Sequence, residues 1–594
     1  MKKLLIIALL AVVNMAQAQY VIEMNDGNVV KWDYELNVIQ NGTGDVWSLS
    51  RTDKFNNNLE LSKVKSVSIA TMAERLAAYK APNYNDDYRN NSGWDKRSSW
   101  NLANVHDPTV MRADDGYYYM YQTDASFGNV HNGNGHFHGR RSKNLVDWEY
   151  LGATMPTVPS WVKDTLDASR TRLGLPLITN PQYGYWAPCA RKVKSGLYRM
   201  YYCIVVDNYI KTGKPASEAF DGSWGERAFI GLMETDDPAS NNWVDKGFVL
   251  SSMSDRGKNW ARSSTSDWEG YFRYNAIDPT FIITPEGEHW MIYGSWHSGF
   301  AAVQLNPETG KTLKEMPEFF TTLGTLNSVV KRVYTRTSNN RWQGSEGPEV
   351  IYRNGYYYMF MAYDGLAVPY NTRVVRSEKI DGPYFNIAGT NVTNGGDALP
   401  LMTHPYKFGN DHGWVGISHC AVWNDGNDNW YYCSQGRYPE NYDTWAPNAI
   451  MLGHVRSIRW TKDGWPIVMP ERYAAVPQTP ITEEDIVGTW EHIDMGYNYG
   501  NQKASSDMVF SADHKITSGT WKNGTWSFDP DTNTLTANGV ELLLQRECDW
   551  EASPRKHTIV YAGITNSKTY WRRHPDPASY RSSRSTRNRS LHLT

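Results

Sequence analysis

One hairpin pattern recurs five times between residues 100 and 470, and it constrains the fold more than any other feature of the sequence. Each copy has a polar residue, a β run, a tight turn and an aromatic strand. The Gly and Asn residues of the turns supply the positive φ angles that hairpins need. The five copies read HDPTVMRADDGYYYMYQT, WAPCARKVKSGLYRMYYC, DPTFIITPEGEHWMIYGS, EGPEVIYRNGYYYMFMAY and HCAVWNDGNDNWYYCSQ.

Each interval between hairpins leaves room for two further strands and a loop. Strand-like runs in these intervals include FIGLMETDDPASNNWVDKGFVL, FAAVQLNPETGK and TRVVRSEKIDGPYF. Five units of about four strands predict an all-β chain with a five-bladed β-propeller at its centre. The alternative is an ordinary β-sandwich, whose strands do not usually repeat one hairpin five times.

The segments that flank the repeat divide the chain further. Residues 1–18 read as a signal peptide, and residues 19–95 as a small β-rich segment with one short helix near MAERLAAY and a polar linker. Residues 96–475 hold the propeller. Residues 481–574 contain six or more short strands, which predict a small β-barrel or sandwich. Residues 575–594 are rich in Arg and Ser and predict a disordered basic tail.

The N-terminus predicts export. Lys2 and Lys3 precede an apolar run from Leu4 to Val13, and Ala16-Gln17-Ala18 forms a small-x-small cleavage site. The run is too short to span a bilayer as a helix, and no other stretch approaches 20 apolar residues. We therefore expect a periplasmic or extracellular protein without a transmembrane segment.

Composition narrows the class of partner. The 60 Lys and Arg residues against 63 Asp and Glu leave a net charge of −3, which argues against a nucleic acid or another polyanion as partner. Aromatic residues make up 13% of the chain, which suits an all-β protein, a carbohydrate-binding protein, or both. We expect a monomer, with its cysteines as buried thiols rather than disulfides, since no CxxC pair occurs. The cysteines are Cys189, Cys203, Cys420, Cys433 and Cys548.

The repeat also predicts a site. We align the hairpins on the middle of the aromatic strand, at Met120, Met200, Met291, Met359 and Tyr432. Counting back thirteen residues reaches Asp107, Ala187, Asp278, Glu346 and His419. The first strand of each propeller blade lines the central channel, so equivalent positions converge in space. The register therefore predicts three carboxyl groups and one imidazole around an axial pocket, unless a bulge shifts it.

Three gathered acids suit the cleavage of a glycosidic bond. That reaction needs one protonated acid at the leaving oxygen and one ionised carboxylate, and a third carboxylate can tune the acid. Like charges held together raise at least one pKa at a cost in stability, which usually marks function. The alternatives are a metal cluster and acids of surface turns, because Asp-Pro is a common turn dipeptide.

The same segments resemble glycoside hydrolase family 43, and most closely its endo-α-1,5-L-arabinanases. The resemblance rests on HDPTVMRADDGYYYMYQT, YWAPCARK, NAIDPTFIITPEGEHWMIYGSWHSGF, EGPEVIYRNGYYYMF and SHCAVW. The part after Ile481 is similar to the small C-terminal β domain of some extracellular arabinanases. The resemblance implies a secreted, inverting hydrolase that cleaves arabinan.

The resemblance also implies roles for the axial residues. Asp107 would be the general base, Glu346 the general acid, and Asp278 would modulate the pKa of the acid and position the sugar. Glu349 competes for the acid role but lies outside the register. His419 matches a histidine beside a central metal ion, usually calcium, that would be largely water-ligated. This chain reads SHCA where the family often reads GHNS, and the alternative is a channel histidine hydrogen-bonded to the acids.

The resemblance further implies a set of substrate contacts. The implied contacts are Asp107, Trp186, Gly231, Asn275, Asp278, Ser295, Trp296 and His297.

The tract GNVHNGNGHFHGRR holds His131, His136 and His138, which we interpret as a loop over the cleft rather than a zinc site.

Three functions stay open on the sequence alone. The first is an endo-acting arabinanase. The second is an exo-acting α-L-arabinofuranosidase or β-xylosidase of the same family, in which a loop such as 208–227 or 251–274 would shape the cleft. The third is a non-catalytic glycan-binding propeller that keeps its acids for a cation.

Overall fold

The computed structural model describes residues 19–32, 36–40, 47–51, 54–84, 91–124, 133–172, 177–207, 224–253, 274–317, 326–336, 345–439 and 451–574. The chain divides into two compact units. One comprises Met1–Ala81 with Val476–Pro480, and the other comprises Pro82–Ala475 with Ile481–Thr594. The predicted signal peptide, the predicted basic tail and His131 lie outside the described residues, as do most of the loops 208–227 and 251–274.

The N-terminal unit contains two small antiparallel sheets among its described residues. One has the order β2-β1-β6 and the other β3-β4-β5. Helix α2 (Met72–Ala77) follows, where the sequence predicts one, and it begins with a capping box between Thr71 and Glu74. The strands are β1 (Tyr20–Met24), β2 (Val29–Trp32), β3 (Leu36–Gln40), β4 (Trp47–Arg51), β5 (Lys54–Glu60) and β6 (Val64–Ile69).

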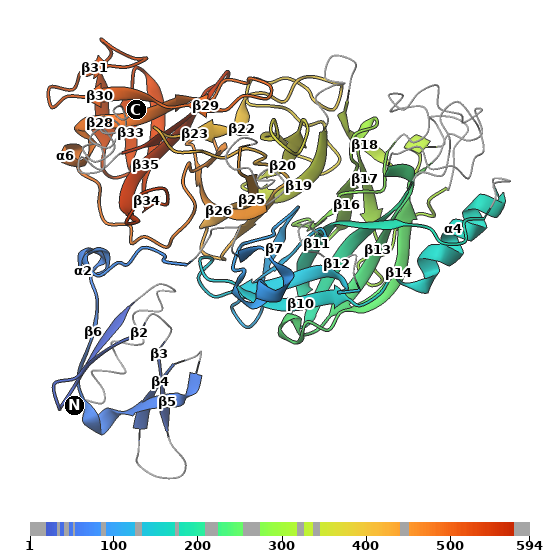
Figure 1. Cartoon of the computed structure of the whole chain (residues 1–594), viewed down its shortest axis with the longest axis horizontal. Coiled ribbons are helices and arrows are strands. Elements are labelled where there is room, and N and C mark those ends of the chain that lie inside the picture. The colour runs from blue at the N-terminus through green and yellow to red at the C-terminus, as the bar shows by residue number, and fades with distance from the viewer. Residues whose placement is uncertain are drawn as a thin grey trace, which may run out of the picture. The chain divides into compact units, whose positions relative to one another are not determined.

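The second unit contains five four-stranded antiparallel sheets, which form the blades of a propeller within the described residues (Figure 1). Blades 1 and 2 are β7 (Thr109–Arg112), β8 (Tyr118–Tyr121), β9 (His136–Ser142) and β10 (Glu149–Met155), then β11 (Tyr183–Lys194), β12 (Leu197–Asp207), β13 (Trp224–Thr235) and β14 (Val244–Ser251). Blade 3 is β15 (Thr280–Ile283), β16 (His289–Tyr293), β17 (Gly299–Leu305) and β18 (Lys331–Thr335). Blades 4 and 5 are β19 (Ser345–Arg353), β20 (Tyr356–Tyr363), β21 (Asn371–Ser377) and β22 (Leu401–Thr403), then β24 (Ala421–Asn424), β25 (Trp430–Arg437), β26 (Met451–Trp460) and β27 (Pro466–Val468).

The blades close into a ring through their first strands. Contacts run from β7 to β11, β15, β19 and β24 in turn, and from β24 back to β7. The chain ahead of β7 is joined to the last blade, because Ala103 forms a bridge with Leu452 and Gly453 donates to the carbonyl of Leu102. This closure confirms the predicted five-bladed propeller and excludes the sandwich.

One helix of the propeller was not expected from the sequence. Helix α4 (Ser160–Arg172) follows blade 1 and packs on β14. Its buried residues include Val162, Leu166 and Ser169, and this spacing of three to four is the helical signal in VPSWVKDTLDASR.

The C-terminal part of the second unit is a β-barrel. Its sheet has the order β31-β30-β28-β36-β35-β34-β33-β32, and a bridge between Lys515 and Thr525 brings its two ends together. Trp490, Phe510 and Tyr561 fill the barrel core. The strands are β28 (Gly488–Asp494), β30 (Ser506–Phe510), β31 (Ile516–Ser518), β32 (Trp526–Asp529), β33 (Thr534–Ala537), β34 (Val540–Asp549), β35 (Lys556–Ile564) and β36 (Thr569–Arg573), after the short helix α6 (Glu483–Ile486).

The barrel is joined to the propeller by backbone pairing and by charge. Strand β23 (Tyr406–Lys407) pairs in parallel with β29 (Lys503–Ala504). Arg573 at the end of β36 is buried and forms ion pairs with carboxylates of both parts, which fixes their contact. The partners are Asp411 and Glu471 before the barrel and Glu491, Asp549 and Glu551 within it.

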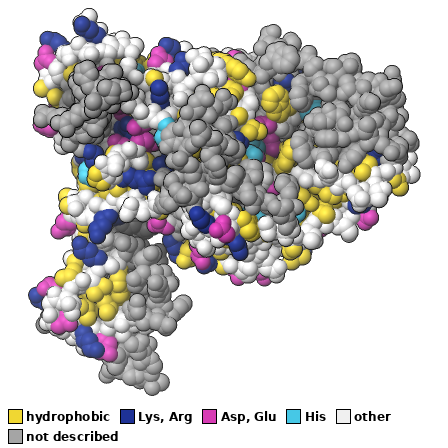
Figure 2. Space-filling model, viewed as in Figure 1, with side chains coloured by type: hydrophobic (Ala, Val, Ile, Leu, Met, Phe, Trp, Pro, Cys, Tyr) yellow, Lys and Arg dark blue, Asp and Glu magenta, His cyan; other side chains and the backbone are white. Residues whose placement is uncertain are grey.

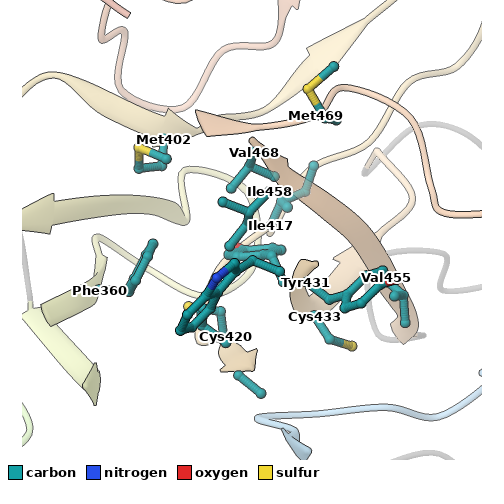
Figure 3. Close-up of a cluster of buried hydrophobic side chains, with 14 of the residues drawn as sticks. Phe360, Met402, Ile417, Cys420, Tyr431, Cys433, Val455, Ile458, Val468 and Met469 are labelled. Atoms are coloured by element: carbon teal, nitrogen blue, oxygen red, sulfur yellow. The ribbon is translucent and has the colours of Figure 1, made fainter. Parts of the chain in front are cut away.

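The largest hydrophobic cluster spans blades 1, 4 and 5 and the adjoining barrel strands. Figure 3 shows part of it, with Phe360, Ile417, Cys420 and Cys433 among the buried side chains. All five cysteines are buried thiols, as the sequence indicates.

The surface and the helices give two further observations. On the face shown in Figure 2, basic and acidic side chains are interspersed among the described residues. Among the residues that the structure describes, no helix combines the length and the apolar character needed to span a bilayer.

Candidate active site

The same backbone distortion occurs at the start of the first strand in every blade. Asp107, Ala187, Asp278, Gly347 and His419 have φ angles of 44°, 34°, 56°, 57° and 55°. A left-handed backbone is uncommon for residues other than glycine, and it costs about 1–3 kcal/mol where it is strained. Five equivalent residues with this distortion therefore mark one level of the channel, and four of them precede proline.

The structure corrects the predicted register in blade 4. Met120 pairs with Val110 in blade 1, but Met359 pairs with Val350, so this hairpin is one residue shorter. Its turn has Asn354 and Gly355 as the two residues between paired strand ends, both with positive φ. Counting back thirteen residues from Met359 therefore goes one residue too far, and Gly347 is the true equivalent of Asp107. Glu346 comes one residue earlier.

Asp107 and His419 form a close pair at the axis. Oδ1 of Asp107 lies 3.0 Å from Nδ1 of His419, and its Oδ2 accepts a 2.7 Å hydrogen bond from Thr123. The backbone N–H of Asp107 donates to Gln435 Oε1, at 3.1 Å. Burial raises the pKa of Asp107, but His106, His419 and Thr123 overcome that effect and hold it well below its usual range. Asp107 is therefore ionised at neutral pH.

Glu346 is held by three donors from neighbouring loops. Ser295 Oγ donates to Oε2 at 3.2 Å, and Trp296 Nε1 donates to the same oxygen at 2.9 Å. The Tyr370 hydroxyl donates to Oε1 and also lies 3.5 Å from His419 Nδ1. Burial raises the pKa of Glu346, although His419 and Tyr370 oppose the rise. Glu346 therefore keeps its proton to a higher pH than an exposed glutamate.

Asp278 has the second raised carboxyl pKa at the axis. Its Oδ2 accepts a 3.0 Å hydrogen bond from the backbone N–H of Gly347. Burial raises its pKa to about 7, and the nearby charges of Glu346 and Asp107 reinforce the rise against His419. The hydrogen bond to Gly347 joins Asp278 to the residue that follows Glu346.

His419 is the cation of this site. Burial opposes its charge, but Asp107 and Asp278 raise its pKa to about 10. Its ring packs over Gly347, where a Cβ atom would lie 2.8 Å from the imidazole. The imidazolium thus lies among three carboxyl groups, of which Asp107 and Asp278 occupy equivalent register positions and Glu346 precedes one.

The donor set around His419 does not fit a protein-coordinated calcium ion. Calcium takes six to eight oxygen ligands, whereas Nδ1 of His419 faces Asp107 and its imidazole carries a proton at neutral pH. Within the described ranges, the group of three potential ligands whose atoms lie within 4.8 Å of one another is Glu471, Asp549 and Glu551, beside Arg573. We derive no chemical step from a metal at the axis, and calcium beside His419 stays a prediction of the resemblance.

Comparison with known proteins places the chain in a family. A family model described as "Glycosyl hydrolases family 43" matches residues 102–466, and a "C-terminal lipocalin-like domain" model matches residues 470–572. The first match covers more than half of the chain. The chain belongs to glycosyl hydrolase family 43.

Relatives in this family have solved structures and assigned activities. An extracellular endo-α-(1→5)-L-arabinanase of Thermotoga petrophila is 24% identical over 80% of this chain and 93% of the relative. A crystal structure of the endo-1,5-α-L-arabinanase of that organism covers 80% of this chain and 99% of its own, with a TM-score of 0.59 and 21% identity. An extracellular exo-α-(1→5)-L-arabinofuranosidase of Cellvibrio japonicus is 25% identical over 62% of this chain and 86% of the relative. The predicted resemblance is confirmed, and the chain is a hydrolase by its family.

Other predicted contact residues of this family 43 chain have different surroundings. Trp186 is half-buried at the axial end of β11, and its carbonyl accepts from the Cys203 thiol. Asn275 is buried with its side-chain oxygen bonded to Ser252, and the carbonyl of His297 accepts from Arg336. These bonds give Asn275 and His297 structural partners beside any contact with substrate.

Gly231 is explained by packing in the family 43 propeller. It lies in β13, the third strand of blade 2, about 10 Å from β11 at the usual strand spacing. A Cβ atom here would lie 2.4 Å from the Tyr202 ring. The close contact with Tyr202 therefore explains why this position is a glycine, without any contact to a sugar.

Glu349 has a structural position in the propeller. Its Oε1 accepts from Arg191 in β11 at 2.5 Å and from the backbone of Val422 in β24 at 3.0 Å, while Oε2 accepts from Thr280 in β15 at 3.1 Å. The carboxylate is therefore engaged by three other blades, whereas the partners of Glu346 come from loops beside the axial site.

The histidines of the glycine-rich tract have separate partners. His136 binds Asp124 at 2.5 Å and stacks on Tyr185, while His138 binds the Tyr150 hydroxyl at 2.8 Å. The structure places His136 and His138 in strand β9, so the prediction that they belong to a loop over the cleft is wrong for these two residues.

Sequence reasoning missed two residues that its own register contains. Thr123 follows Met120 by three residues, and Gln435 follows Tyr432 by three, so they are equivalent positions of the second strands. Both hydrogen-bond Asp107. Tyr370 and Arg437 were also missed, and Arg437 is buried with a positive charge that interacts with Asp107.

Proposed function

We propose that this chain is a secreted hydrolase that cleaves the α-1,5-L-arabinofuranosidic bonds of arabinan within the polymer, with inversion at the anomeric carbon. The observation that carries the proposal is the cluster of Asp107, Asp278 and Glu346 around His419, in which one carboxyl pKa is lowered and two are raised. The activities of the related arabinanase and arabinofuranosidase support arabinan as the substrate.

The split in pKa supports the roles that the family resemblance implies. Asp107 is ionised and accepts a proton from the attacking water, so it serves as the general base. Glu346 retains its proton and donates it to the leaving sugar oxygen, so it serves as the general acid. Asp278 would serve as the modulator through the mutual repulsion of its carboxyl group and that of Glu346, which raises the pKa of Asp278, and it holds the Gly347 backbone.

Inversion is the outcome that the family resemblance implies, and it requires space for a water molecule between the two carboxyl groups. Inverting enzymes hold these groups roughly 6.5–9.5 Å apart, whereas retaining enzymes hold them about 5–5.5 Å apart. Proton NMR of the first product formed from an arabino-oligosaccharide should show the β-anomer of the newly released reducing end. An initial α-anomer would contradict the assignment of Asp107 as a base.

The role of Glu346 has a specific test. Glu346→Gln removes the proton donor, and kcat on linear arabinan should fall by about 10²–10⁴-fold. An aryl arabinofuranoside with a good leaving group needs little protonation, so its rate should fall much less. Equal losses on both substrates, or no loss on arabinan, would contradict the role of general acid.

Endo action is separated from exo action by the products over time. Linear arabinan should first yield a mixture of oligosaccharides, with slow release of arabinose. Arabinose as the first product would favour the exo-acting alternative, and rapid cleavage of an aryl β-xyloside would favour a β-xylosidase. Binding of arabinan without any product would favour the non-catalytic propeller.

A further inference from the structure

A second cavity lies on the outer edge of the propeller, where blade 1 meets blade 2. Its volume is about 340 Å³, within the range of ligand sites. It is lined by the end of β10, the first turn of α4 and the two outer strands of blade 2. Strand β10 is three strands from β7 and β13 is two strands from β11, so the cavity lies about 10–14 Å from the axial strands.

Two tryptophans form the apolar part of this cavity. Trp243 is buried and packs edge-on against Tyr121, with ring centroids 5.2 Å apart. Trp161 is half-buried, and its ring packs edge-on against Phe229 and Phe248. Edge-on neighbours fix the orientation of each indole, and the half-buried Trp161 presents the rest of its surface to the cavity.

Asp245 supplies the polar part of the cavity. Its Oδ2 accepts a 3.2 Å hydrogen bond from Trp161 Nε1, and its Oδ1 accepts a 2.5 Å hydrogen bond from the Tyr202 hydroxyl. A carboxylate has about four acceptor sites, so two are left for hydroxyl donors of a ligand. The two hydrogen bonds also fix the position of the Asp245 carboxylate relative to the Trp161 ring.

The charge around the cavity favours a neutral ligand. A carboxylate on the wall disfavours anionic sugars and phosphates. A cation is disfavoured too, because Lys311 interacts electrostatically with Asp245. Lys311 is held there by hydrogen bonds to the carbonyls of Lys246, Gly247 and Phe248 at 2.7–2.8 Å. A ligand with apolar C–H faces and several hydroxyls meets all of these conditions.

We propose that this cavity is a second, non-catalytic binding site for a neutral polysaccharide chain, of the class that the axial site cleaves. The choice of polymer rests on the proposed function, whereas the requirement for a neutral sugar rests on the cavity. A polymer long enough to reach both sites gains affinity through effective concentration, and a short oligosaccharide does not.

The test compares three variants of the full chain. Trp161→Ala removes an aromatic wall, and Thr157→Arg places a long side chain at an exposed lining position without touching the core. Trp290→Ala is the matched control, since this half-buried tryptophan also donates Nε1 to a carboxylate, that of Glu288, but lies in blade 3. Thermal unfolding of each variant checks that the fold is retained.

The readout is binding and turnover on long and short substrates. Affinity electrophoresis in linear arabinan uses the variants in a Glu346→Gln background, so that the polymer survives. We expect Trp161→Ala and Thr157→Arg to weaken retardation and to raise KM on the polymer about 2- to 10-fold, which is the range for one aromatic contact. Neither should change kcat or KM on an aryl arabinofuranoside. Trp290→Ala should behave as the parent does.

Two outcomes would overturn the proposal. One is unchanged retardation and polymer KM in both variants. The other is weaker retardation and a higher polymer KM in Trp161→Ala but not in Thr157→Arg. Such an effect would come from packing around Trp161, because blocking the cavity does not reproduce it. Stronger retardation by polygalacturonate than by arabinan would contradict a neutral ligand. If the parent binds arabinan through Trp161 but cleaves no arabinan, the proposed function fails and this inference stands.

Discussion

Single residues set the protonation of the axial site. Tyr370 hydrogen-bonds Glu346 and approaches His419, and Thr123 links Asp107 to the backbone of Ala187 at 2.7 Å each. The left-handed φ angles of Asp107, Asp278 and His419 are uncommon for residues with side chains. We infer that this unfavourable backbone conformation persists because it directs the three side chains toward one point.

Tyr370→Phe should shift the pH dependence of activity. A general acid works while it is protonated, so activity falls as the pH rises through the pKa of Glu346. The Tyr370 hydroxyl stabilises ionised Glu346 and lowers that pKa. Its removal should therefore raise the pKa and move the alkaline limb of the kcat/KM profile to higher pH, with the acidic limb almost unchanged.

The measurement is the pH profile from pH 3 to 10 on linear arabinan, whose cleavage needs the protonated acid. Tyr352→Phe is a suitable control, because Tyr352 is 37% exposed and lies in the hairpin of blade 4. An alkaline limb that stays in place, or that moves to lower pH, would contradict the function of Tyr370 as a partner of Glu346.

At the scale of elements, the first strands hold one another through a shared polar network. Glu349 in β19 binds groups of β11, β15 and β24. Arg191 continues the network to β7, since it donates to Thr109 at 3.1 Å. One buried ion pair with hydrogen bonds thus joins all five blades below the site.

Glu349→Gln should destabilise the propeller more than it affects the chemistry. Breaking a buried ion pair leaves Arg191 without its counter-charge and costs about 3–5 kcal/mol. We expect a lower urea midpoint for the unfolding of the full chain. Glu288→Gln, at an exposed position, should change stability by less than about 0.5 kcal/mol.

The activity of the same variant separates structure from catalysis. Below its unfolding transition, Glu349→Gln should keep most of its kcat on arabinan, unlike Glu346→Gln. A Glu349→Gln protein that is as stable as the parent but inactive would reverse the two assignments.

At the scale of the whole molecule, the barrel contacts a loop that reaches the axial site. Tyr497 of the barrel part donates to Asp364 at 2.9 Å, and Asp364 also accepts from Asn371 at 2.6 Å. The chain between Asp364 and Asn371 carries Tyr370. Tyr497 is thus a positioning residue for the loop, and the barrel supports the propeller beside the site.

Tyr497→Phe should weaken this support without removing any group at the axis. The buried Asp364 loses a donor, which costs about 1–3 kcal/mol. We expect kcat to fall on long and short substrates alike, with the alkaline limb shifted to higher pH as in Tyr370→Phe. Tyr499→Phe is the control, because Tyr499 is 58% exposed in the same segment. Unchanged kcat and pH profile in Tyr497→Phe would refute the positioning role.

The sequence by itself determined the propeller, because a hairpin repeated five times can bury its aromatic strands in only a few ways. It also determined that Asp107, Asp278 and His419 meet, since equivalent positions of a symmetric ring converge. Glu346 was found although its hairpin is one residue shorter, because its neighbour Gly347 is the equivalent residue.

Only the tertiary structure decided the partners of these residues. Tyr370 comes from the loop between β20 and β21, and Tyr497 from the barrel. The paths of such segments depend on long-range packing, and so does the burial of Glu349 among other blades. A local repeat carries no information about long-range packing. The cavity beside helix α4 follows from the same kind of contact between distant segments, whereas the helix itself has a periodic signal in the sequence.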